Sequence, residues 1–164
     1  MNFSLKPHQL VAHWVPGFMF LIFLAPSHPI ARSAVESLLP RGDALRGFVL
    51  AVVASPLGEF LDCMRDLCEN IWDRWSEIRW DFFFDADQDR FDRFYGSYFT
   101  YYVFNCNLAL SLLYFSLTRL ISHKYDQVAV GLIVACVFIA DAYFLRKNIA
   151  THTKCVSPRR DKRS

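Results

Sequence analysis

Two stretches of 25 residues without a charged side chain limit what this chain can fold into. They run from Pro7 to Ala31 and from Phe94 to Thr118. A helix of about 20 mostly apolar residues crosses a lipid bilayer, and inside the bilayer an open chain satisfies its backbone polar groups only as a helix. The two runs therefore predict membrane-spanning helices. Of the 164 residues 54% are hydrophobic, which excludes an intrinsically disordered chain.

Two shorter apolar runs are marginal as membrane spans. Gly47 to Gly58 has twelve residues, and Gln127 to Ala140 has fourteen and can continue past Asp141 to Leu145. Packed behind the two long runs, they complete a bundle of four helices. We expect an all-α, polytopic membrane protein with spans at about residues 9–30, 44–61, 96–119 and 127–145 in a single membrane domain, residues 1–145. Pro26 to Asp43, with three prolines, is expected to be mainly loop.

The basic residues predict the orientation of these spans. With four spans, the N-terminus, the 62–93 segment and the C-terminal tail share one side, which carries 13 Lys and Arg residues against five on the other. Loops rich in Lys and Arg stay in the cytoplasm, so both termini are expected there. A cleaved signal peptide in place of the first span would leave the orientation of the others unchanged.

A long amphipathic helix is expected to leave the second span, over about Pro56 to Trp80. Its apolar and acidic side chains recur in steps of three and four with an offset of about 200°, so they occupy opposite faces. The acidic side chains form a stripe on the face that we expect to point outward, while the apolar face packs on the bundle or on a second subunit. A cation-attracting vestibule or a docking face for the basic tail is the functional alternative. The acidic stripe consists of Glu59, Asp62, Asp66, Glu69, Asp73 and Glu77.

An alternating Asp pattern follows this helix. Asp85, Asp87 and Asp89 could place carboxylate oxygens around a divalent cation, the only cofactor that the sequence suggests. The EF-hand pattern would need Gly and Glu where Arg90 and Gly96 stand. The alternative is a polar turn whose Asp side chains cap the next helix.

Five polar residues lie within or at the ends of the apolar runs, where their cost favours the interior of the bundle. Asn105 and Asn107 are about 200° apart on a helix, so we expect each to bond a different neighbour. Asp141 is expected to pair with Arg146, and His13 to make a packing hydrogen bond or relay protons. The intramembrane polar set is His13, Glu59, Asn105, Asn107 and Asp141.

The tail of residues 146–164 carries seven basic residues and one acid. We expect it to be disordered and to bind anionic lipid headgroups, or to dock on the acidic stripe. No stacking platform or reading module accompanies it, so nucleic acid is not an expected partner.

No catalytic or nucleotide-binding motif occurs in the sequence. We therefore expect a small, non-enzymatic integral membrane protein that forms a homo-oligomer or partners another membrane protein, with a pore or channel-like assembly as the specific version. The alternative is a membrane-embedded, divalent-metal-dependent hydrolase acting on a lipid or phosphate substrate. That alternative rests on Asp85, Asp87 and Asp89 together with Glu59 and Asp62.

Overall fold

The computed structural model describes residues 7–38, 44–72 and 94–155, and throughout these ranges the chain is helical with short turns. The helices are α1 (Pro7–Leu24), α2 (Pro29–Leu38), α3 (Ala44–Trp72), α6 (Thr100–Ile121) and α7 (Tyr125–Cys155), and a π-helical turn, η1 (Tyr95–Phe99), leads into α6. The all-helical expectation is confirmed. Two of the helices, α6 and α7, are long and apolar enough to cross a membrane.

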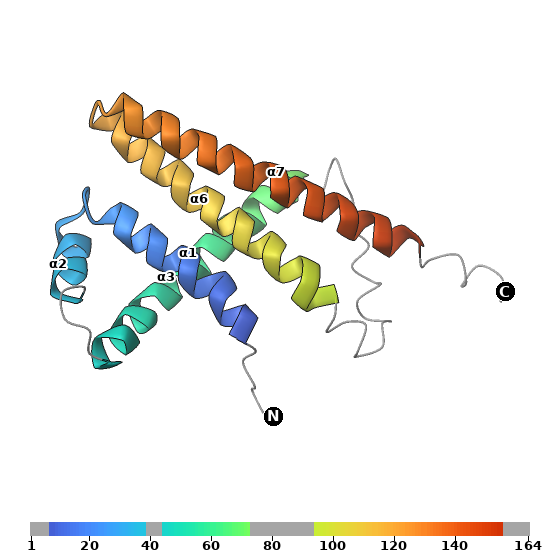
Figure 1. The fold of residues 1–164 in the computed structure, drawn as a ribbon, viewed down its shortest axis with the longest axis horizontal. Coiled ribbons are helices and arrows are strands. Elements are labelled where there is room, and N and C mark those ends of the chain that lie inside the picture. The colour runs from blue at the N-terminus through green and yellow to red at the C-terminus, as the bar shows by residue number, and fades with distance from the viewer. Residues whose placement is uncertain (1–6, 39–43, 73–93, 156–164) are drawn as a thin grey trace.

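The helix α6 is central, because α1, α3 and α7 all pack against it. Figure 1 shows α6 and α7 lying side by side as an antiparallel hairpin, with α1 on the other side of α6 and α3 crossing behind. Along the long axis, α1 and α6 begin near the end where α7 finishes, and α2 lies at the opposite end. The four long helices therefore alternate in direction.

The segments of α2 and α7 are more helical than the sequence pattern predicts, whereas α3 follows the expectation of an amphipathic helix that leaves the second span. The short helix α2 occupies the middle of the expected loop. The helix α3 continues from Ala44 to Trp72 through Pro56, so the second apolar run and the amphipathic segment form one helix up to that point. The helix α7 extends to Cys155, ten residues past the expected end of the fourth span. Arg146 and Ile149 are fully buried, and their packing keeps this part of the expected disordered tail helical.

A crossing of small residues brings α1 and α3 into backbone contact. A Cβ atom on Gly17 would lie 2.8 Å from the backbone nitrogen of Gly58 and would overlap the carbonyl oxygen of Ala54. A Cβ atom on Gly58 would lie 2.5 Å from the carbonyl oxygen of His13. Small residues allow this approach, which is typical of helix pairs in membranes. The crossing places His13 beside the polar face of α3.

We predict that Gly17→Ala and Gly58→Ala each destabilise the protein by about 1–3 kcal/mol, the usual cost of overpacking. Alanine favours helix over glycine by about 1 kcal/mol, so a loss of stability would be due to the clash. Thermal unfolding in one fixed detergent measures it. Ala129→Val, which enlarges an exposed side chain on α7, is the control and should leave the midpoint unchanged. Equal midpoints for all three variants would contradict the close crossing.

Candidate functional site

Two carboxylates of the acidic stripe on α3 point into the protein, opposite to our expectation. Asp62 is only 9% exposed, and the side chain of Glu69 is 15% exposed. The opposite face of α3 carries exposed apolar side chains, with Leu67 62% and Ile71 65% exposed, and Phe60 and Met64 continue it. The predicted outward orientation is therefore wrong for Asp62 and Glu69, whereas Glu59 and Asp66 are exposed as predicted.

Partners inside the protein account for the burial of Asp62 and Glu69. In water the apolar face of an amphipathic helix turns inward, whereas in an apolar surrounding a charged face avoids a large desolvation cost only by finding partners inside the protein. The helices α1 and α6 supply such partners for α3. The outer stripe of Phe60, Met64, Leu67 and Ile71 is left exposed on the opposite side of α3.

Arg65 is the centre of the buried charges on α3. Its guanidinium lies 2.6 Å from Asp62 Oδ1, 2.8 Å from Asp66 Oδ1 and 3.2 Å from Glu69 Oε1. The side chain of Arg65 is 11% exposed and that of Asp66 is 63% exposed. One guanidinium therefore holds two largely buried carboxylates and one exposed carboxylate on successive turns of the same helix.

Asp62 connects α3 to α1 and α6. Its Oδ2 lies 2.5 Å from Nδ1 of His13 on α1, and its Oδ1 accepts a hydrogen bond of 2.8 Å from Nδ2 of Asn107 on α6. The hydroxyl of Ser111 lies 2.9 Å from the Asn107 carbonyl oxygen and 3.3 Å from that of Pro16. A single carboxylate thus receives polar groups from three helices, and the polar contacts continue between α6 and α1.

Glu59 completes a group of metal-ligating side chains. Donor atoms of His13, Glu59 and Asp62 all lie within 4.8 Å of one another. Glu59 is exposed and His13 is half-buried, so the group reaches the surface on this side. The expected cation site at Asp85, Asp87 and Asp89 lies outside the described residues, as do Asp73 and Glu77 of the acidic stripe.

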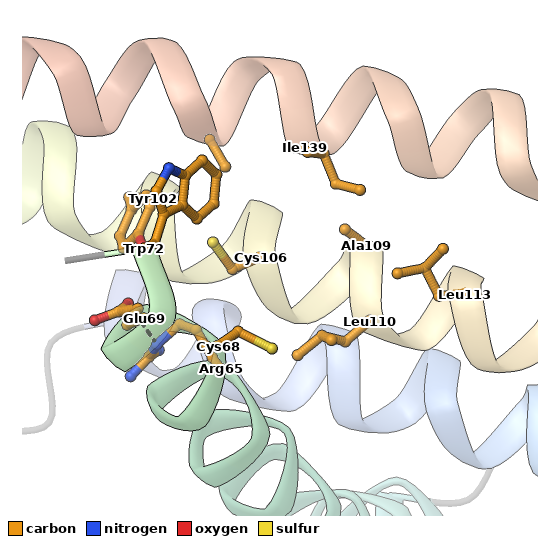
Figure 2. Close-up of a pocket in the computed structure, with 11 residues that line it drawn as sticks. Arg65, Cys68, Glu69, Trp72, Tyr102, Cys106, Ala109, Leu110, Leu113 and Ile139 are labelled. Atoms are coloured by element: carbon orange, nitrogen blue, oxygen red, sulfur yellow. Dashed lines mark ion pairs between the residues drawn. The ribbon is translucent and has the colours of Figure 1, made fainter. Parts of the chain in front are cut away.

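A pocket of about 180 Å³ adjoins the charged face of α3. Figure 2 shows Arg65 and Glu69 at one end of it, with Tyr102 and Trp72 nearby. From there the pocket follows α6 along Cys106, Ala109 and Leu113, with Ile139 of α7 opposite. The accessible lining of the pocket is almost entirely apolar, although Arg65 and Glu69 stand at one end of it.

Asn105 and Asn107 bond to different helices. Asn105 Nδ2 donates to Asp141 Oδ2 on α7 over 2.6 Å, whereas Asn107 faces α3. The expected pairing of Asp141 with Arg146 is wrong, because five residues on a helix separate two side chains by about 140°. The guanidinium of Arg146 donates instead to the hydroxyl of Tyr102 over 3.0 Å and lies 5.6 Å from the ring centre of Trp72.

Sequence reasoning missed three parts of this site. These are the central position of Arg65 among the carboxylates of α3 and the two members of the contact between Tyr102 and Arg146. The one available signal for the helix crossing was the spacing of Ala54 and Gly58, a small residue at every fourth position. Nothing in the local pattern links Tyr102 to Arg146, which are 44 positions apart.

We predict that Asp62→Ala destabilises the protein by about 3–5 kcal/mol, the usual cost of removing one partner from a buried ionic network. Asp66→Ala is a matched control, because it removes the same side chain from the same helix and the same arginine. Asp66 is exposed, so its loss should cost at most about 1 kcal/mol. Thermal unfolding of both variants in one detergent compares them. Equal losses would mean that α3 does not present Asp62 to α1 and α6.

No protein-family model, curated protein or solved structure matches this chain. A function must therefore be argued from the geometry: charged groups inside the protein, apolar side chains on its surface, and a polar cluster that joins three helices.

Proposed function

We propose that this chain is a multi-pass integral membrane protein that acts by assembling with copies of itself or with another membrane protein. The observation that carries the proposal is its reversed polarity. Arg146 is 1% exposed and Asn107 is fully buried, while α3, α6 and α7 carry large exposed apolar side chains. Such a surface suits hydrocarbon and is a liability in water.

The helix α7 gives further support. A helix in the core of a soluble protein can be equally apolar, but it is mostly buried. Only 17% of the most apolar 18-residue stretch of α7 is buried. In the membrane arrangement that we propose, α1 and α3 cross the bilayer with α6 and α7, and both termini lie in the cytoplasm. The alternating direction of the four helices agrees with this topology.

This topology predicts which positions react with reagents outside the cell membrane. Single cysteines at Ser27 and Lys124, in a chain without its five native cysteines, should react with a membrane-impermeant maleimide in intact cells. A single cysteine at Thr151 should react only after the membrane is permeabilised. All three positions are exposed, so access to the reagent is the variable that the experiment tests. Labelling of Thr151→Cys in intact cells would contradict the cytoplasmic C-terminus.

The side of α7 that faces away from α6 is the surface that we propose for assembly. The buried positions Gly131, Ala135, Ala142 and Ile149 repeat in steps of four and seven along the seam with α6. The outer seam of α7, defined as Val130, Ile133, Val137 and Phe144, repeats in steps of three, four and seven, and each of these residues is at least 60% exposed. Apolar repeats of this kind are typical of left-handed helix pairs.

The pore version of the hypothesis receives less support. A pore shared by several copies needs polar side chains on the surface where the copies meet. In the described part of the chain, polar side chains that bond to another helix face the interior of a single copy. We therefore propose a helical assembly protein and leave the pore version aside.

Cross-linking in native membranes tests the assembly. In the cysteine-free chain, Ile133→Cys or Val137→Cys on the outer seam should form disulfide-linked dimers under mild oxidation. Ala135→Cys is the matched control, because it lies on the same helix at a similar depth but faces α6 and is fully buried. It should give at most about a tenth as much dimer as the outer-seam variants. Absence of dimer from all three, with a monodisperse monomer in several mild detergents, would overturn self-association.

A further inference from the structure

We propose that His13, Glu59 and Asp62 bind a divalent cation of the first transition series, with the side-chain oxygen of Asn107 as a fourth donor. The proposal goes beyond the assembly function and stands independently of it. It replaces the sequence-predicted cation site with one on the described helices. One donor comes from α1, two come from successive turns of α3, and the fourth comes from α6.

The spacing of the donor atoms suits one ion. Nitrogen and oxygen ligands lie about 2.0–2.2 Å from such metals, so two ligands on opposite sides of an ion are about 4.2 Å apart. The donor atoms of His13, Glu59 and Asp62 lie within 4.8 Å of one another, and small side-chain rotations close that difference. Imidazole with carboxylates favours Zn²⁺, Fe²⁺ or Mn²⁺ over Mg²⁺ and Ca²⁺.

The side chain of Asn107 is the observation that points to a ligand. It is 0% exposed, yet its Oδ1 has no hydrogen-bond partner in the described part of the chain. Its Nδ2 already lies 2.8 Å from Asp62 Oδ1. A half-turn of the amide group exchanges the two atoms and directs the oxygen at the cluster. Next to a carboxylate this orientation is favourable when a cation bound by that carboxylate offsets the repulsion between the oxygens.

The charge of the surroundings also suits a dication. Glu59, Asp62, Asp66 and Glu69 place four carboxylates on neighbouring turns of α3, and Arg65 of the same helix contacts three of them, Asp62, Asp66 and Glu69. Arg65 binds Oδ1 of Asp62, which leaves Oδ2 for His13 or a metal ion. The arginine therefore orients the carboxylate of Asp62.

Cation binding requires a second rearrangement besides the half-turn of the Asn107 amide. His13 Nδ1 and Asp62 Oδ2 are 2.5 Å apart, whereas two tetrahedral ligands of one ion are about 3.4 Å apart at ordinary bond lengths. The pair must separate by about 1 Å, and the proton between the two atoms leaves as the ion enters. The exposed Glu59 and the half-buried His13 provide the route to the surface.

Titration with Mn²⁺ tests the proposal, since thiols compete weakly for this ion. The full-length chain in detergent, treated first with a chelator, is titrated while electron paramagnetic resonance measures the free ion. We expect one Mn²⁺ per chain, with a ¹⁴N coupling that is lost in His13→Gln. Glu59→Gln, which changes an exposed residue, should weaken binding at least tenfold while unfolding of the metal-free chain stays unchanged.

Two further variants separate this site from other sources of binding. Asp66→Asn makes the same change of charge on the same helix outside the cluster, and its affinity should stay within about twofold of the unchanged chain. The triple change of Asp85, Asp87 and Asp89 to Asn should also retain binding. The proposal is overturned by failure to saturate at one ion per chain, by equal weakening in Asp66→Asn and Glu59→Gln, or by loss of binding in the triple variant.

Discussion

The contact between Asp62 and Arg65 is the interaction on which the rest of the structure depends. A charged group inside a protein is stable only when partners replace its water, and α3 supplies just part of what its buried groups require. The other part comes from His13 on α1 and Asn107 on α6. The positions of three helices are therefore tied to one carboxylate.

Asp62 can contact groups on three helices because these helices approach one another closely. Without side chains at Gly17 and Gly58, the backbones of α1 and α3 meet at van der Waals distance, and His13 is carried to the turn of α3 that bears Glu59 and Asp62. A similar contact occurs at Gly131, where a Cβ atom would overlap the hydroxyl of Ser116 on α6. Small residues thus set the distances between helices, and the polar groups set which faces meet.

The sequence predicts the helices and the two faces of α3 well, because both follow from local spacing. It also separates Asn105 from Asn107 correctly, since an offset of 200° cannot place both on one neighbour. It does not predict which face of α3 turns inward. The same pattern fits a helix in water with its carboxylates outside and a helix in an apolar surrounding with its carboxylates inside. The partners of Arg65, Tyr102 and Arg146 depend on how distant helices pack, and no local spacing encodes that.

The reversed face of α3 connects the membrane proposal with the cation proposal. If α3 faced water, Asp62 would be solvated and His13 would have no reason to approach it. Its outer face carries Phe60, Leu67 and Ile71, and the buried carboxylate of Asp62 finds its partners inside the protein. The cluster of His13, Glu59 and Asp62 is the place where the packing gathers donors from two helices within reach of one ion. Arg65 contacts three carboxylates of α3 with a single positive charge, and the negative charge that remains is what a divalent cation would balance.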